Sequence, residues 1–115
     1  MARADGKLDY LEMAGGDLPA SKAFYAEAFG WKFLDYGPTY AAFENAGLDG
    51  GLQADRGESP AAPLPVLYAE DLEAMVERVT AAGGELVKPI FSFPGGRRFH
   101  FRDPAGNELA VWSET

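Results

Sequence analysis

The order of the elements that the sequence predicts repeats once along the chain, and this repeat constrains the fold more than any other feature. In each half, an apolar strand is followed by an Asp-Leu pair, a helix and three further short strands. The Asp-Leu pairs, at positions 17–18 and 71–72, stand at the same point of each half. The pattern predicts two βαβββ modules, over about 7–54 and 64–113. They are joined by a linker over 55–63 that contains glycine, serine and proline.

Local signals predict where the two helices begin and end. Asp17 is a favourable N-cap, Pro19 suits a first helical turn, and Gly30 is expected to end the first helix. Its apolar face is predicted from Leu18, Phe24, Tyr25, Ala28 and Phe29. The second helix is expected after Asp71, because apolar residues then follow at i, i+3, i+4 and i+7. These residues are Leu72, Met75, Val76 and Val79.

Glycine and proline predict the turns. The Gly50-Gly51 and Gly95-Gly96 pairs are interpreted as hairpin turns, because neither opens a helix as a phosphate-binding loop must. Pro89 predicts a kink in a strand over 85–93. The run Asp-Pro-Ala-Gly-Asn at 103–107 predicts a tight turn with a structural role.

Composition excludes several classes of protein. A chain of 115 residues with 47% hydrophobic residues is long and apolar enough for one folded domain. It has no cysteine and only one histidine, His100, so disulfides, zinc–thiolate sites and multi-histidine metal sites within one chain are excluded. No membrane span or secretory signal is visible, so we expect a cytoplasmic location. The net charge of −8 disfavours nucleic acids and anionic membranes as partners.

Several motifs lie at fixed places in the two halves. The first half has Leu-Asp-Tyr-Leu-Glu-Met at 8–13, Asp-Leu-x3-Lys-Ala-Phe-Tyr at 17–25 and Phe-Gly-Trp at 29–31. The second half has Asp-Leu at 71–72, Ala-Gly-Gly at 82–84 and Phe-His-Phe-x-Asp-Pro-x-Gly-Asn at 99–107. With these motifs the chain resembles the vicinal oxygen chelate superfamily, which includes glyoxalase I, bleomycin resistance proteins, fosfomycin resistance enzymes and extradiol dioxygenases.

The resemblance implies an α+β fold in which residues 1–115 form a single glyoxalase-like domain. Its two βαβββ modules are expected to form a U-shaped mixed sheet around a cleft, with the helices on the outer face. In metal-dependent members, His, Glu and Gln ligands project into this cleft from the first and last strands of the modules. The corresponding positions here are Tyr10, Leu64 and Ala110, with Gln53 near the fourth. Since leucine and alanine cannot coordinate a metal, we predict no metal and no cofactor.

Strand alternation predicts which side chains face the cleft. If Tyr10 faces it, Glu12 does so too, and if Ala110 faces it, Glu108 and Trp112 follow. The predicted ligand-binding residues are Tyr10, Glu12, Gln53, Tyr68, Arg98, His100, Glu108 and Trp112. Phe99 and Phe101 are expected in the core. Alternatively, the polar and aromatic residues fill a closed groove or a dimer interface.

The polar candidates allow more than one interpretation. His100 is a candidate general acid or base together with Glu12, or a metal ligand beside Glu12 or Glu108. Alternatively, it is a strand residue that is hydrogen-bonded to a neighbouring carboxylate. Three arginines, Arg97, Arg98 and Arg102, also allow two interpretations. They either orient an anionic ligand or form ion pairs with Glu12, Glu108 or an adjacent acidic strand.

Two functions remain open from the sequence. The first is a metal-free protein that binds a small aromatic or cationic molecule, with stacking on Trp112, Tyr10 and Tyr68 and a cation paired to a glutamate. The alternative is an enzyme of the lyase, isomerase or dioxygenase type, with an atypical metal site or acid/base catalysis by His100 and Glu12. We also expect a homodimer, because a second chain could cover the exposed strand edges and the aromatic groove.

Overall fold

The computed structural model describes residues 3–115, which form two compact units. Unit 2 comprises Tyr10–Leu64, and unit 1 comprises Pro65–Thr115 together with the described residues up to Asp9. The first strand therefore starts in unit 1 and continues into unit 2. Unit 2 is one continuous segment, whereas unit 1 combines the segment before Tyr10 with the second half of the chain. For example, the Tyr68 backbone N–H donates to the Lys7 carbonyl.

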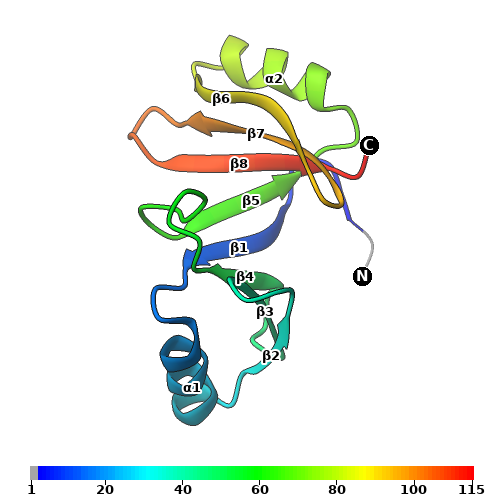
Figure 1. The fold of residues 1–115 in the computed structure, drawn as a ribbon. Coiled ribbons are helices and arrows are strands. Elements are labelled where there is room, and N and C mark those ends of the chain that lie inside the picture. Colours follow the sequence, from blue (N-terminus) through cyan, green and yellow to red (C-terminus); the bar gives the residue numbers. More distant parts are fainter. Residues whose placement is uncertain (1–2) are drawn as a thin grey trace. The chain divides into compact units, whose positions relative to one another are not determined.

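Unit 2 contains one helix and a four-stranded sheet of mixed direction (Figure 1). Its elements are β1 (Leu8–Ala14), α1 (Leu18–Phe29), β2 (Lys32–Asp35), β3 (Tyr40–Glu44) and β4 (Gly50–Gln53). The spatial order of its strands is β2-β3-β4-β1. The β2–β3 and β3–β4 pairs are antiparallel, whereas β1 lies parallel to β4.

Unit 1 repeats this topology. Its elements are β5 (Leu64–Tyr68), α2 (Leu72–Ala81), β6 (Glu85–Phe93), β7 (Gly96–Arg102) and β8 (Glu108–Ser113). The strand order β5-β8-β7-β6 again places the first strand of the module parallel to its last strand. The other two pairs are antiparallel. The two expected βαβββ motifs and the α+β class are thus confirmed.

The helix ends follow the predicted caps. The Asp17 carboxylate accepts from the Ala20 N–H, and the Asp71 carboxylate accepts from the Ala74 N–H. Gly30 ends α1 in the left-handed region at φ 76°, where glycine has no steric penalty. No helix in the described part of the chain is long and apolar enough to cross a membrane.

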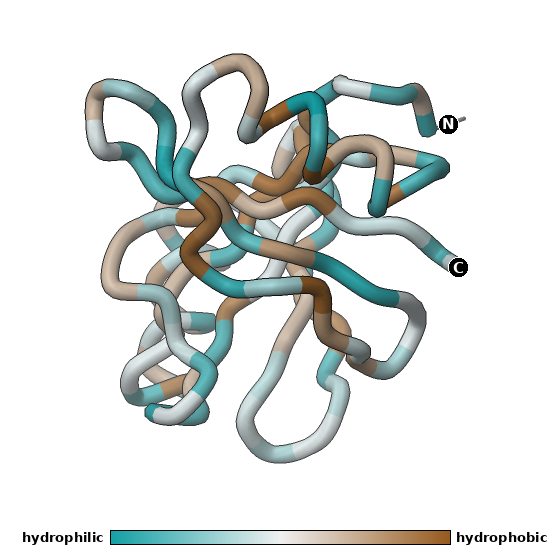
Figure 2. Tube along the Cα trace, turned by 90° about the horizontal axis from the view of Figure 1, so that it is seen from above, coloured by the Kyte–Doolittle hydropathy of each residue, from teal (hydrophilic) through white to brown (hydrophobic). Residues whose placement is uncertain are grey.

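Each unit has its own hydrophobic core, between its helix and one face of its sheet. In unit 1, Leu72 of α2 packs with Phe99 of β7 and Val111 of β8, and all three are buried. Met75, Val76, Val79 and Phe101 pack against this cluster, as the sequence predicts. In unit 2, Leu18 of α1 packs with Ala41 and Leu52. The hydropathy-coloured trace in Figure 2 is mainly hydrophilic next to the marked chain ends.

The prediction of a turn at Gly50-Gly51 is wrong. Both glycines are buried inside β4 and pair with β1 on one side and β3 on the other. A Cβ atom at Gly50 would stand 2.2 Å from the Leu11 carbonyl oxygen and from the Phe43 ring, and one at Gly51 would stand 2.2 Å from the Tyr40 hydroxyl. The glycines are therefore explained by close approach of neighbouring strands and rings, and not by turn geometry.

The apolar face predicted for α1 is only partly buried. Leu18 is buried and Tyr25 packs against the core, but Phe24 and Phe29 are 57% and 64% exposed. The exposed rings contact other rings instead: Phe24 lies edge-on to Tyr25 with centroids 5.0 Å apart, and Tyr25 stacks on Trp31 at 4.6 Å. Helical spacing therefore identified apolar residues here, but not which of them the sheet covers.

The two special segments of unit 1 behave as predicted. Around Pro89, the pairing of β6 with β7 shifts register on both sides of Lys88, which produces the expected irregularity. The turn after β7 is held by Asp103, which accepts from the backbone N–H groups of Ala105 and Asn107 and from the Asn107 side chain. The Asn107 hydrogen bond lowers the pKa of Asp103.

Candidate functional site

In unit 1, the buried His100 of β7 is paired with Glu108 of β8. The His100 Nδ1 atom lies 2.8 Å from the Glu108 Oε2 atom, and His100 is only 3% exposed. The alternation that places Phe99 in the helix-side core turns His100 to the opposite face of the sheet. The interpretation of His100 as a histidine bonded to a neighbouring carboxylate is therefore correct, and Glu108 is its partner.

This geometry determines what the second ring nitrogen can do. Because a carboxylate only accepts hydrogen bonds, the proton of a neutral ring lies on Nδ1, and Nε2 is an acceptor. Burial lowers the pKa of His100 and outweighs the hydrogen bond to Glu108, which raises it. The ring is thus neutral at pH 7. The Nε2 atom is buried and has no hydrogen-bond partner among residues 3–115.

Aromatic rings surround this part of the sheet. Trp112 of β8 lies edge-on to Tyr68 at 5.6 Å and has Phe93 at 6.2 Å, and Phe91 lies 5.7 Å from the His100 ring. The guanidinium of Arg98 lies over Phe91 and Phe93, at 5.4 and 5.7 Å. We call this set the aromatic face of unit 1: Tyr68, Phe91, Phe93, Arg98, His100 and Trp112.

Three residues at Trp112 were missed by the sequence analysis. The indole Nε1–H of Trp112 donates to the Asp9 carboxylate at 2.9 Å. Arg3 places its guanidinium carbon 4.8 Å from the centre of the Trp112 ring and pairs with Asp9 and Glu114. Asp9 lies 103 residues from Trp112 in sequence. No local signal could have identified this contact, since alternation says only which face of its own strand a residue occupies.

The predicted site residues of unit 2 form a second group. The Tyr10 and Tyr40 hydroxyls are hydrogen-bonded to each other, and burial raises the pKa of Tyr10. Glu12, on the same strand, is 6% exposed. The Gln53 side-chain oxygen accepts from the Asp55 N–H, so this residue is engaged in a local turn. Tyr40, which sequence reasoning also missed, covers Gly51 with its ring.

The three arginines near the end of the chain do not form one anion-binding patch. Arg97 points to the helix side and pairs with Glu73 of α2 at 2.7 Å. Arg102 pairs with Glu85 of β6 at 3.2 Å. Arg98 instead belongs to the aromatic face. Ion pairing with an adjacent strand, one of the two interpretations of this cluster, holds for Arg102. Arg97 also forms an ion pair, but its partner Glu73 lies on α2 and was not among the expected partners.

The residues at the superfamily's metal-ligand positions do not provide the donor set of a metal centre. Leu64 and Ala110 are buried apolar residues, and the Tyr10 hydroxyl is bonded to Tyr40. Among the described residues, no three His, Cys, Asp or Glu side chains gather closely enough to hold a metal ion. Divalent metals in proteins need about three such ligands. The residues at these positions therefore do not fit the superfamily's metal site.

The chain is similar in sequence to proteins that are longer than itself. It is 29% identical over 130 residues to the anthracycline biosynthesis protein DnrV of Streptomyces peucetius, an alignment that covers 95% of this chain and 47% of DnrV. The chain spans about half the length of the curated relatives that it matches.

Solved structures share the fold. Methylmalonyl-CoA epimerase of Mycobacterium tuberculosis superposes with a TM-score of 0.70 at 16% identity, covering 98% of this chain and 91% of the epimerase. The Mn(II)-bound glyoxalase of Novosphingobium aromaticivorans gives 0.68 at 23% identity, covering 98% of this chain and 40% of that one. The family profile matches residues 7–111. With the repeated βαβββ topology, this match shows that the chain belongs to the Glyoxalase/Bleomycin resistance protein/Dioxygenase superfamily.

Proposed function

We propose that this protein binds a small organic molecule on the aromatic face of unit 1, without a metal ion. The observation that carries the proposal is the His100 Nε2 atom, which is buried and has no partner among the described residues. A buried acceptor without a partner costs about 1–3 kcal/mol. A ligand that donates a hydrogen bond to Nε2 would remove this penalty.

The chemistry of the face specifies the ligand further. Rings of Tyr68, Phe91 and Trp112 offer apolar contact, so a ligand with an aromatic ring is favoured. The group that meets His100 must be a donor, such as a hydroxyl, because Nδ1–H is already bonded to Glu108. We therefore propose a small hydroxylated aromatic compound as the ligand class.

A panel of phenols and their methyl ethers tests this proposal, because each ether keeps the ring and loses the donor. Trp31→Phe leaves Trp112 as the sole tryptophan, so its fluorescence reports binding. We expect the phenols to bind about tenfold more tightly than the ethers, which corresponds to about 1.4 kcal/mol. His100→Phe should abolish this preference. Equal binding of phenols and ethers, or no binding of either, would contradict the proposal.

Two further measurements test the remaining parts. Trp112→Ala should weaken binding several-fold, because a ring contact contributes about 0.5–1.5 kcal/mol.

Binding of the phenols should persist in the presence of a chelator, and elemental analysis of protein purified without chelator should find no stoichiometric divalent metal. Near-unit zinc, nickel or iron together with loss of binding in the chelator would reject the metal-free proposal.

The alternative is an enzyme that uses His100 as a general base. The His100–Glu108 pair favours it, because a carboxylate that orients Nδ1–H leaves Nε2 available to take a proton. The sequence analysis paired His100 with Glu12, but the carboxylate bonded to His100 is that of Glu108. Turnover of a bound phenol, lost in His100→Phe but retained in Glu12→Gln, would favour this alternative over simple binding.

We also propose a homodimer in the cytoplasm. The support is the exposed aromatic pair Phe24 and Phe29 on α1, together with the edge strands β2 and β6. Sedimentation at micromolar concentration should give about twice the chain mass of 12.4 kDa. A single species at the chain mass would reject the dimer.

A further inference from the structure

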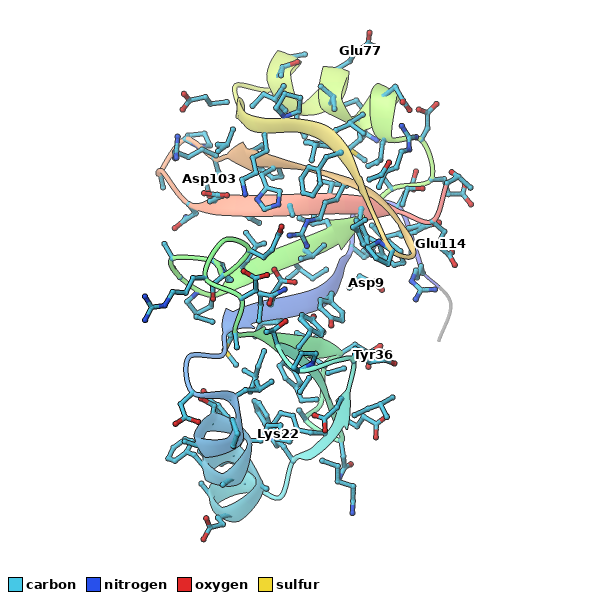
Figure 3. All side chains as sticks on the ribbon, in the orientation of Figure 1. Asp9, Lys22, Tyr36, Glu77, Asp103 and Glu114 are labelled. Atoms are coloured by element: carbon cyan, nitrogen blue, oxygen red, sulfur yellow. The ribbon has the colours of Figure 1, made fainter. Side chains whose placement is uncertain are left out.

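A guanidinium from the chain itself lies on the face of Trp112. The Arg3 guanidinium carbon is 4.8 Å from the centre of the indole ring, which is within the range of a cation–π contact. The same guanidinium lies 3.4 Å from the Asp9 carboxylate and 3.8 Å from that of Glu114. Figure 3 labels Asp9 and Glu114, which lie near the chain ends of unit 1. One cation is thus held by a ring and two carboxylates.

The indole is held in place by other contacts. Asp9 accepts a hydrogen bond from Trp112 Nε1–H at 2.9 Å, so one carboxylate both orients the ring and pairs with the cation. The buried Tyr68 ring supports the indole edge-on at 5.6 Å. Neither of these two contacts involves Arg3, and support of this kind is what a preorganised binding site requires.

Arg3, by contrast, is suited to leave. Its side chain is 42% exposed, and Glu114 on the other side of it is 57% exposed. Exposed ion pairs of this kind contribute little to stability. An external cation could make the same three contacts, and all of the groups that it would need belong to unit 1.

We propose that Trp112, Asp9 and Glu114 form a binding site for a flat organic cation of the amidinium or guanidinium class, and that Arg3 is its internal competitor. The carboxylates supply the charge complement, and the indole supplies a π surface for a planar cation. The inference goes beyond the proposed function, because it needs no contact of His100 and shares only Trp112 with it. Arg3 would reduce the apparent affinity for such a ligand by occupying the site.

Benzamidine is a suitable probe, and benzamide is its uncharged control. The protein has two tryptophans, so an NMR spectrum of labelled protein contains two indole N–H signals, which Trp31→Phe assigns. We expect benzamidine to shift the Trp112 signal saturably and to leave that of Trp31 unchanged. In Arg3→Ala, the apparent dissociation constant should fall by about three- to tenfold. Arg56→Ala, which removes an equal charge from the exposed linker, should leave the constant unchanged.

The carboxylates provide the second arm of the test. In the Arg3→Ala background, Asp9→Asn should abolish benzamidine binding, and Glu114→Gln should weaken it by about two- to threefold. Asp9→Asn can also displace the indole, because Asp9 accepts the Trp112 Nε1–H hydrogen bond. Glu114→Gln and the expected loss of benzamidine binding at high salt therefore test the need for negative charge without removing that hydrogen bond.

Three outcomes would overturn the cation site. These are an unmoved Trp112 signal in Arg3→Ala, equal affinities in wild type and Arg3→Ala, and an equal response to benzamide. None of them bears on the comparison of phenols with ethers at His100, so the two proposals can fail separately.

Discussion

The two units of this protein share a topology but differ in what they present on the face away from the helix. Leu52 of β4 and Val111 of β8 both pack under their helices, which aligns the last strands of the two modules. Gly51 then corresponds to Ala110, and Gln53 to Trp112. The backbone pattern is thus repeated, whereas the side chains at equivalent positions have diverged.

The divergence continues on the neighbouring strands. Ala42 of β3 is paired with Gly51, while His100 of β7 is paired with Ala110. Unit 2 thus has small residues where unit 1 has its histidine. In unit 2 the ring of Tyr40 covers Gly51, whereas in unit 1 the counterpart Ala110 is paired across the strands with His100. In these two modules, the βαβββ topology constrains the helix-side core, whereas the residues on the opposite face differ.

The largest expected effect comes from the two cores. Phe99 of unit 1 has Ala41 as its counterpart in unit 2, since each is paired with the core residue of the last strand. Phe99→Ala should lower the free energy of unfolding by about 3–5 kcal/mol, because the ring is fully buried and leaves a cavity. Urea unfolding measures this loss. A loss similar to that of Ala41→Gly would show that the two positions contribute equally to stability, and would contradict the difference between the two cores.

The glycines of β4 provide the next effect. Gly50→Ala should destabilise the protein by about 1–3 kcal/mol, because the added Cβ meets the Leu11 carbonyl oxygen, which cannot move without shifting β1. Gly57→Ala is the matched control, since its Cβ would make only an ordinary contact at 3.5 Å. Thermal unfolding compares the two variants, and equal melting temperatures would contradict the close-approach explanation.

A pH titration sharpens the difference at His100, because unit 2 has no histidine. The folded pKa is lowered below the ordinary value of 6.5, so the unfolded chain binds the proton more readily. The stability that depends on a neutral His100 is present above pH 6.5, and it is lost as the pH falls through the folded pKa. We expect the free energy of unfolding to fall between about pH 7.5 and 5.5 in wild type, and to fall less in His100→Asn. Equal slopes in this window would contradict the burial of a neutral ring.

The smallest expected change in stability comes from the exposed ring on α1, compared with a core-packed residue on α2. Phe24→Ser on α1 should change the free energy of unfolding by about 1 kcal/mol or less, because the ring is largely exposed and loses only aromatic edge contacts. Val76→Ser on α2 should cost more, because Val76 packs against the core of unit 1. Chemical denaturation of both variants makes the comparison. A larger loss for Phe24→Ser would mean that α1 buries this ring against another surface.

Much of the fold is determined by signals that are local in sequence. A cap such as Asp17 reaches an N–H three residues away, and alternation in β8 separates Val111 from Trp112 without reference to any other strand. The same logic predicted that Phe99 lies in the core and His100 on the opposite face. These predictions held because each depends on the geometry of one helix turn or one strand.

Tertiary structure decided the contacts between strands that are distant in sequence. The need for glycine at positions 50 and 51 depends on the rings of Phe43 and Tyr40. The contact of Trp112 with Asp9 depends on the packing of segments far apart in sequence. That Phe24 stays exposed while Leu18 is buried is likewise seen only in the folded chain. Register and coverage are set by the packing of whole elements, to which each residue contributes little. The sequence by itself therefore determined which residues share a face, and only the folded chain determined which of them meet.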